Sequence, residues 1–389
     1  MIINKGILDL YAFGGDGGYQ TSGDVVTHTT DGIDLNAMWD QYQQTLAYWN
    51  ARKTGLVGLF TYPVVNLVEN VPQVGKAAFE EASEYGEPTA GKIKVSYIQL
   101  GYDFKDYDVA SRWTWRFLRD ADARQVAAMH NAYLMADADL IFRKVMEAIW
   151  DNRNRSTLIR NQAYNVYPLY NGDGTIPPDY GTNTFDNTHD HYLVSGGANV
   201  DPGDLEEALD HIEEHGYSRQ NGTVLICLVN KAQAAVIRNF RQGVTTNGVV
   251  ANYDFIPAGN QPPMILPNDQ GLLGERPPDS WNGLTVIGSY RGAYIIEELS
   301  VPEGYMLTFG SGGLGQLQNL VGLREHANPA YRGLRLIPGN QQGYPLVDSY
   351  YARSFGTGVR QRGGAVITQF KASGSYDVPT IYKKGEGLS

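Results

Sequence analysis

The chain is poor in residues on which several classes of protein depend. Of its 389 residues one is a cysteine, which excludes an internal disulfide framework. No apolar run approaches the roughly 18 residues of a membrane span. The N-terminus lacks the basic region and apolar block of a signal peptide. We therefore expect a protein that is made in a reducing cytoplasm and does not enter a membrane.

Charged residues are also scarce, and acidic ones prevail. They make up 19% of the chain, and the net charge is −11. The longest basic segments, 153–155 and 360–362, hold two arginines each. Proteins that bind the phosphate backbone of nucleic acids need larger clusters of lysine and arginine. The composition therefore argues against sequence-specific binding of nucleic acids.

Glycine and tyrosine are abundant instead, with 45 and 26 residues, and hydrophobic residues make up 42% of the chain. That hydrophobic content is enough to form a core. Tyrosine enrichment with low charge is typical of the cores of protein–protein interfaces. The composition favours extensive contact with other protein chains.

The first part of the sequence predicts an extended arm followed by a helix. Residues 1–33 are rich in Gly and Asp and show no sustained period. A helix is expected over 35–52, with Asp34 as its N-cap and Gly55 at its end. Trp39, Tyr42 and Trp49 share one stripe of it, which needs a large covering surface.

Residues 56–110 predict a long two-stranded hairpin. Apart from the adjacent Tyr97 and Ile98, the segment 92–100 alternates between apolar and polar residues, which indicates a strand with one wet face. Its partner strand is expected around 62–71, and a polar tip around 80–91. Because an isolated hairpin is marginal in water, its apolar face should lie on another subunit.

Residues 102–167 contain neither glycine nor proline. Apolar residues within this stretch keep helical spacing, which predicts one helix over about 119–150. Such a helix would be about 48 Å long, far above the usual three or four turns. We expect it to act as a stiff spine.

The remainder predicts an irregular segment at 160–200 and then a mixed α/β region. Helices are expected at 203–215 and 231–241, and strands at 223–229, 284–290, 293–299, 306–309, 364–371 and 376–381. Cys227 lies within the apolar strand at 223–229, where a thiol is a small buried hydrophobe.

Two histidine patterns raise the question of a metal. His211, Glu214 and His215 fit the H-x-x-E-H pattern of a zinc hydrolase, with Glu297 or Glu298 as a third ligand. The alternative is an ordinary helix end, where the dipole favours histidine. His189 and His191 lie on one side of an extended segment and could bind an ion. Hydrogen-bonded loop histidines are the simpler interpretation.

Two glycine-containing patterns fail their fuller tests. Residues 310–315 satisfy G-x-G-x-x-G, but no Asp or Glu lies between 326 and 347 to hold a ribose, so we interpret them as a flexible loop. Residues 171–174 resemble the start of a calcium loop, but Tyr180 stands where the twelfth-position Glu is required. No nucleophile arrangement can be identified.

The order of these parts resembles the major capsid proteins of tailed bacteriophages, which have the Hong Kong 97 fold. Four short segments are similar in sequence to the capsid proteins of phages of actinobacteria: 117–123, 189–196, 228–230 and 351–360. The resemblance implies an α+β fold. Its parts would be the N-arm and N-terminal helix (1–55), the E-loop hairpin (56–110), the peripheral domain with its spine helix (111–200), the axial domain (201–340) and a return to the peripheral domain (341–389).

The resemblance implies a structural protein, not an enzyme, without a cofactor; whether a structural metal is bound stays open. Hexamers and pentamers would form an icosahedral head around double-stranded DNA, assembled in the host cytoplasm. Its other partners would be a scaffolding protein, a portal and a decoration protein. The residues expected at contacts between subunits are Trp39, Tyr42, Trp49, Lys76, Phe79, Lys92, Lys94, Arg353 and Arg360.

Some members of this family join subunits by an isopeptide bond between an E-loop lysine and a late asparagine. Lys76, Lys92 and Lys94 could supply the lysine. Residues 341–389 contain no asparagine, so we expect a shell without covalent cross-links.

Two alternatives remain open from the sequence. An encapsulin shares the fold and would be a cellular compartment around a cargo enzyme. A metal-dependent hydrolase would use His211, Glu214 and His215.

Overall fold

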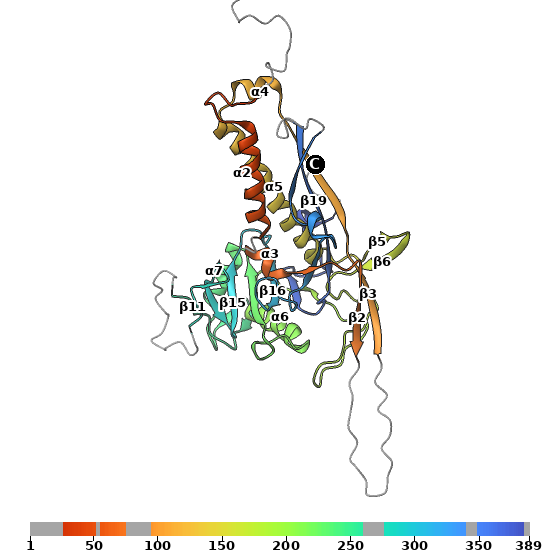
Figure 1. The fold of residues 1–389 in the computed structure, drawn as a ribbon. Helices are drawn as coiled ribbons and strands as arrows, with labels where there is room; N and C mark the ends of the chain where they lie inside the picture. Colours follow the sequence, from red (N-terminus) through yellow and green to blue (C-terminus); the bar gives the residue numbers. More distant parts are fainter. Residues whose placement is uncertain (1–25, 52–54, 75–94, 260–275, 340–347, 385–389) are drawn as a thin grey trace, which may run out of the picture. The chain divides into compact units, whose positions relative to one another are not determined.

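The computed structural model describes residues 26–51, 55–74, 95–259, 276–339 and 348–384 (Figure 1). The chain divides into two compact units. The first, here called the helical unit, combines Met1–Ala51, Tyr107–Ala136 and Leu334–Arg353. The second, the sheet unit, combines Arg52–Asp106, Asp137–Gly333 and Ser354–Ser389. Neither unit is continuous in sequence.

Helix α2 (Leu35–Ala51) forms part of the core of the helical unit and confirms the helix predicted at 35–52. Asp34 Oδ1 accepts a hydrogen bond from the Asn36 backbone N–H at 2.9 Å, so Asp34 caps the helix as expected. Its buried stripe follows steps of three and four residues and packs against side chains from all three segments of the unit. The stripe consists of Leu35, Met38, Tyr42 and Leu46.

The single helix predicted at 119–150 is wrong at its start, because two helices occupy the region. They are α4 (Trp115–Asp120) and α5 (Ala123–Trp150). Ala121 is extended, with φ −85° and ψ 145°. Asp122 Oδ1 then accepts from the Gln125 N–H, and Gln125 Oε1 accepts from the Asp122 N–H. This reciprocal pair begins α5 as a capping box. The long spine helix is otherwise present.

The sheet unit is built on a seven-stranded sheet in the order β11-β14-β15-β8-β16-β20-β7. The pairs β15–β8 and β20–β7 are parallel, and the other neighbours are antiparallel. In chain order the strands are β7 (Tyr192–Val194), β8 (Val224–Val229), β11 (Ile256–Pro257), β14 (Gly288–Tyr290), β15 (Ala293–Glu297), β16 (Tyr305–Ser311) and β20 (Ala365–Gln369).

Helices cover both faces of this sheet. On β8, Ile226 and Leu228 face the cluster that contains α3 (Gly55–Phe60) and the end of α5. Cys227 and Val229 face the opposite cluster, which contains α6 (Pro202–Glu214) and α7 (Lys231–Ile237). A strand buried on both faces is apolar at every position, as predicted for this segment. Burial raises the pKa of Cys227 to about 12, which fits a thiol inside the core.

Further strands lie outside that sheet. In the sheet unit, β1 (Thr61–Val64) runs parallel to β17 (Val321–Arg324), which pairs with the last residues of β19 (Asp348–Val359). In the helical unit, β18 (Arg335–Pro338) pairs with earlier residues of β19. The remaining strands are β2 (Val68–Val74), β3 (Val95–Gly101), β4 (Lys105–Arg112), β5 (Arg155–Ile159), β6 (Gln162–Val166), β9 (Thr245–Thr246), β10 (Val249–Val250), β12 (Ser280–Trp281) and β13 (Leu284–Thr285). Short 3₁₀ helices occupy Arg219–Asn221, Pro329–Tyr331 and Thr380–Tyr382.

The strand predicted at 376–381 is wrong. The segment has no ladder partner and ends in a 3₁₀ helix that follows Pro379. Tyr376 in this segment and Tyr382 after it bury individually: the Tyr376 hydroxyl donates to the Trp150 carbonyl at 3.0 Å, and Tyr382 stacks on Trp150. Apolar content alone therefore misled the prediction.

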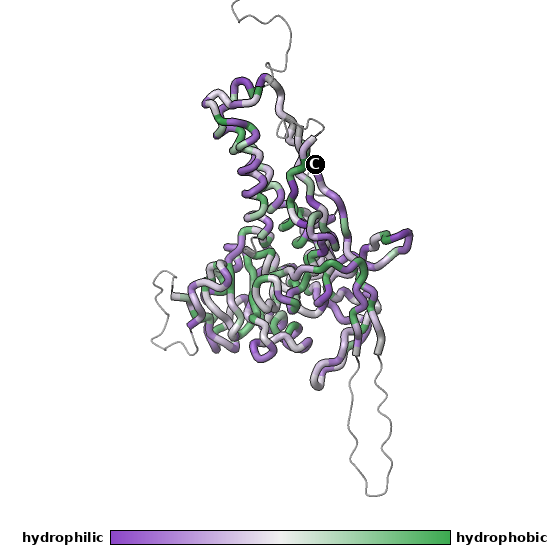
Figure 2. Tube along the Cα trace, viewed as in Figure 1, coloured by the Kyte–Doolittle hydropathy of each residue, from purple (hydrophilic) through white to green (hydrophobic). Residues whose placement is uncertain are grey.

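Figure 2 shows hydrophobic and hydrophilic residues alternating along α2, as a helix with one buried face requires. None of the helices within the described ranges has the length and apolar content to cross a membrane.

The N-terminus of α6 yields a prediction about pH. Asp201 and Asp204 form a reciprocal capping box, and burial, together with the charges of Asp201 and Glu207, raises the pKa of Asp204 to about 7. The Asp204 carboxyl therefore holds its proton more tightly in the folded protein than in the unfolded chain. As a result, the free energy of unfolding should fall as pH rises from the ordinary pKa of 3.8 through 7.

We therefore expect Asp204→Asn, which keeps an acceptor for the Asp201 N–H, to weaken this pH dependence. The wild type should lose free energy of unfolding relative to the variant between pH 5 and pH 8, measured by chemical denaturation at each pH. Parallel profiles would contradict the assignment.

Candidate assembly surfaces

The hairpin of β2 and β3 is a candidate surface for contact with other chains. The strands pair in antiparallel register from Val68–Gly101 to Val74–Val95, and Figure 1 shows them side by side. Tyr97 is 65% exposed, whereas its neighbours Ile98 and Leu100 turn toward the protein. The described part of this hairpin thus has one wet face, as predicted, but Tyr97 lies on it, although its position in the alternation assigned it to the apolar face with Ile93 and Val95.

A network of polar and aromatic side chains anchors the base of this hairpin. The Tyr102 hydroxyl donates to one Glu69 oxygen at 2.6 Å, and Arg360 Nε lies 3.1 Å from the other. The Arg360 guanidinium also lies over the ring of the buried Tyr62, 5.9 Å from its centre. Arg360 therefore has partners within its own chain, at the base of the hairpin. Lys76, Phe79, Lys92 and Lys94 lie outside the described residues.

The aromatic stripe of α2 is covered largely within the helical unit. Tyr42 is buried and stacks on His130 with ring centres 3.9 Å apart, so it offers no surface to a second subunit. Trp39 and Trp49 are half-buried against the same cluster. Tyr48, which the sequence analysis did not single out, is 79% exposed. Arg353 on β19 is half-buried.

A second hairpin, β5 and β6, was missed in the segment predicted to be irregular. Its strands are joined by Arg160 and Asn161, which have φ values of 51° and 63°. Two-residue hairpin loops often require positive φ at both positions, for which Asn-Gly is the strong signal, and Arg-Asn is a weak one. Leu158 beside this turn is 77% exposed. An exposed apolar side chain on a hairpin is a second candidate contact.

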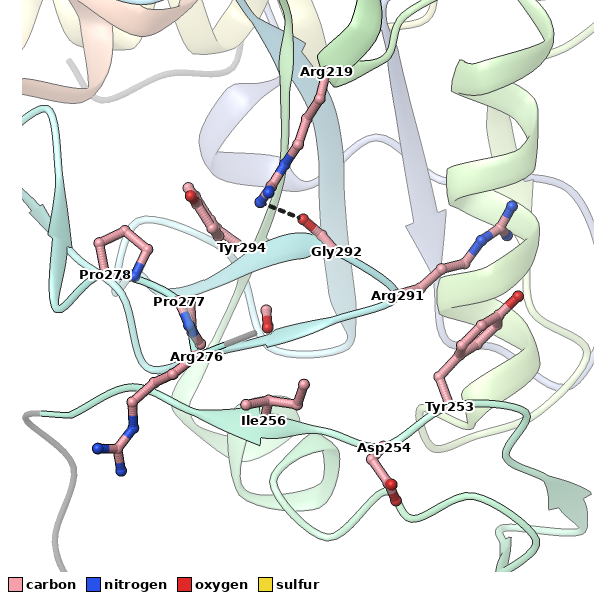
Figure 3. Close-up of a pocket in the computed structure, with 11 residues that line it drawn as sticks. Arg219, Tyr253, Asp254, Ile256, Arg276, Pro277, Pro278, Arg291, Gly292 and Tyr294 are labelled. Carbon is pink, nitrogen blue, oxygen red and sulfur yellow. Dashed lines mark hydrogen bonds between the residues drawn. The ribbon is translucent and has the colours of Figure 1, made fainter. Parts of the chain in front are cut away.

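The sheet unit also carries an open pocket of about 340 Å³ (Figure 3). Its arginines serve protein partners: Arg219 donates to the Gly292 carbonyl at 2.9 Å, and Arg291 pairs with Asp210 and Glu213. Its one carboxylate, Asp254, accepts from the Gln242 N–H. No histidine or second carboxylate lines it, so its described lining lacks an acid–base pair.

The glycine-rich segment 310–315 comprises the end of β16 and a partly buried turn held by side-chain hydrogen bonds, so its interpretation as a flexible loop is wrong. Ser311 ends β16, and its hydroxyl donates to Asn319 Oδ1 at 2.9 Å. The Asn319 amide group donates to the carbonyl oxygens of Gly58, Thr61 and Gly313. Asn319, fully buried, therefore fixes this turn through its own side chain.

The histidines combine differently from the H-x-x-E-H pattern. His215 lies next to His189 and His191, with ring nitrogens 2.9 and 3.0 Å apart. Within the described residues, His211 and Glu214 are not members of this cluster. The His211 Nδ1 lies 3.0 Å from the Glu207 carbonyl, and Glu297 pairs with Arg238. The proposed zinc-hydrolase grouping is therefore not formed.

No family model matches the chain, and no curated protein sequence matches it. A solved chain from Mycobacterium phage Patience is 54% identical, with a TM-score of 0.75, over 97% of this chain and 99% of that chain. The capsid of cyanophage P-SCSP1u is 15% identical with a TM-score of 0.42, over 83% and 90% of the two chains. The SrpI encapsulin of Synechococcus elongatus is 13% identical with a TM-score of 0.41, over 97% and 99%.

Identity above one half along nearly the whole of both chains places this protein and the Patience chain in one family. The mixed helices and sheets described above agree with the fold of that family, and membership of the family indicates a structural role. The chain belongs to the major capsid proteins of tailed bacteriophages that have the Hong Kong 97 fold.

Proposed function

We propose that copies of this chain assemble as hexamers and pentamers into the icosahedral head that encloses double-stranded DNA. The observation that supports this proposal is the similarity to the Patience chain, at 54% identity over nearly the whole of both chains. In this arrangement the five parts are the N-arm and helix (1–55), the E-loop (56–110), the peripheral domain (111–200), the axial domain (201–340) and the return (341–389). The protein acts without catalysis and without a cofactor.

The contacts between subunits are proposed to involve side chains of the N-terminal helix, the E-loop and the returning strand. Trp39 and Trp49 would complete their burial against a neighbour, and Arg353 would lie near them. Lys76, Phe79, Lys92 and Lys94 would contact the adjacent subunit from the E-loop. Tyr42 and Arg360 support these surfaces from within the chain, since their described partners are its own residues.

The charge of the chain suits a wall around DNA. With a net charge of −11, the inner surface would attract the phosphate backbone only weakly, which allows DNA to enter and leave. Filling and closing such a head would need a scaffolding protein, a portal and, on the outside, a decoration protein. Assembly would take place in the host cytoplasm.

The proposal predicts particles when the chain is expressed, with or without a co-expressed scaffolding protein, and negative-stain microscopy would reveal them. Denaturing gels of those particles should show one band at 42.9 kDa, because residues 341–389 offer no asparagine to a cross-linking lysine. A ladder of multimers would contradict the noncovalent shell. A stable monomer under every condition would overturn the proposal itself.

A further inference from the structure

Three histidines from distant parts of the sheet unit bring their Nε2 atoms together. His189 and His191 precede β7, and His215 is the C-cap residue of α6. The three nitrogen–nitrogen distances are 3.0 Å (His189–His191), 2.9 Å (His189–His215) and 3.0 Å (His191–His215). They form a nearly equilateral triangle, and all three residues belong to one compact unit.

The surrounding structure holds these rings in place. His191 is fully buried. Its backbone N–H donates to the Tyr170 carbonyl, and its backbone carbonyl accepts from the Ile367 N–H. The His215 ring stacks on Phe185, with ring centres 4.3 Å apart. A Cβ at Gly363 would come within 2.7 Å of the His215 ring, so only glycine leaves it room. The triangle is therefore built into the fold from several segments.

Hydrogen bonds among the three neutral rings cannot give every Nε2 atom a favourable partner. The His191 Nδ1 lies 2.6 Å from the Ala365 carbonyl, which can only accept, so Nδ1 carries the hydrogen and Nε2 of the neutral ring is a lone pair. Two N–H groups directed at that lone pair would face each other at 2.9 Å. A bond from His189 to His215, or the reverse, would leave two lone pairs in contact. Every arrangement of neutral rings keeps one unfavourable pair.

A cation removes this conflict. We propose that His189, His191 and His215 bind a divalent transition-metal ion, with zinc as the best-suited member of that class. The centre of a triangle with 3 Å edges lies about 1.7 Å from each corner. An ion about 1 Å above it would therefore be about 2.0–2.1 Å from all three nitrogens, the usual zinc–imidazole distance.

The ligand type and its supports agree with this assignment. Neutral imidazoles suit zinc and other first-row ions of similar softness. The Ala365 carbonyl on His191 Nδ1 is the kind of second partner that orients a metal-binding histidine. His189 and His215 are only half-buried, which leaves a fourth position open to water. The ion would tie the end of α6 to the segment before β7, and this role holds whatever assembly the chain forms.

The test uses the full chain without a histidine tag. After treatment with EDTA and exchange into zinc buffer, elemental analysis should find about one equivalent of zinc per chain. Cobalt(II) should give the visible absorption of a site with nitrogen ligands. Thermal unfolding should shift upward with zinc and downward with EDTA, since a ligand of the folded state stabilises it.

Variants separate this site from other histidines. His189→Ala and His215→Ala should weaken zinc binding at least tenfold and abolish the thermal shift. His211→Ala, one turn earlier on α6, and His326→Ala should each retain one equivalent. If the first two variants fail to fold, the wild-type stoichiometry and cobalt spectrum still decide the matter. Wild-type protein that takes up no zinc, or controls that lose as much as the triangle variants, would overturn the proposal.

Discussion

A variant that lacks residues 75–91 is expected to fold and to remain unassembled. Val74 pairs with Val95, so the deletion joins the ends of β2 and β3 through residues 92–94. Three-residue connections are common in hairpins. The base of the hairpin is held separately by Glu69, Tyr102 and Arg360. The strands should therefore keep their register without the deleted segment.

Assembly should fail because the proposed contact with the adjacent subunit is removed. We expect closed particles to fall at least tenfold in yield, counted by negative-stain microscopy and sedimentation. Circular dichroism and the melting temperature of the unassembled protein should stay close to those of the wild type. A replacement of 75–91 by a Gly/Ser segment of equal length is the matched control, and it should assemble poorly if side chains such as Phe79 form the contact. Particles of normal size and yield from the deletion would refute the role.

Substitution of Arg362 by alanine is expected to destabilise the protein by about 3–5 kcal/mol, the usual cost of breaking a buried ion pair. The Arg362 side chain is 4% exposed, and its guanidinium lies 2.9 Å from Asp173 and over the rings of Tyr167 and Tyr170. It also donates to Thr175 and to two backbone carbonyls. Burial opposes ionisation of Asp173, but Thr175 and Arg362 outweigh it and lower the Asp173 pKa. Alanine would leave this buried carboxylate without its cation.

Chemical denaturation of the unassembled protein would measure this loss. Arg124→Ala is the matched control, because Arg124 also pairs with an aspartate at 3.1 Å but is 91% exposed. Exposed pairs contribute less than about 1 kcal/mol. A double-mutant cycle with Asp173→Asn would isolate the coupling between the two side chains. Similar small losses for Arg362→Ala and Arg124→Ala would show that the buried pair contributes little.

The sequence predicts elements well where local signals and burial agree. Helix α2 and the buried strand β8 follow from periodicity and from a cap at Asp34. The start of α5 could also have been predicted, because Asp122 and Gln125 have the spacing of a capping box. The β5–β6 hairpin could not, since an Arg-Asn turn carries little local signal.

The candidate sites depend on contacts that no local pattern contains. The sequence offered His189 with His191 and, separately, His211 with His215. Only the packing of α6 beside the segment before β7 selects His215 and leaves His211 out. Arg360 and Arg362 looked like a short basic segment, yet each turns to carboxylates of its own chain. Partners that lie far apart along the chain are chosen by tertiary structure.

The discontinuity of the helical unit has a consequence for biosynthesis. The Asn50 side chain near the end of α2 donates to the Leu334 carbonyl and accepts from the Leu334 N–H, both at 2.8 Å. A ribosome-bound chain that has not reached Leu334 therefore cannot complete the packing of its own N-terminal helix. Products truncated before Leu334 should lack a finished helical unit, and a growing shell would thereby exclude them.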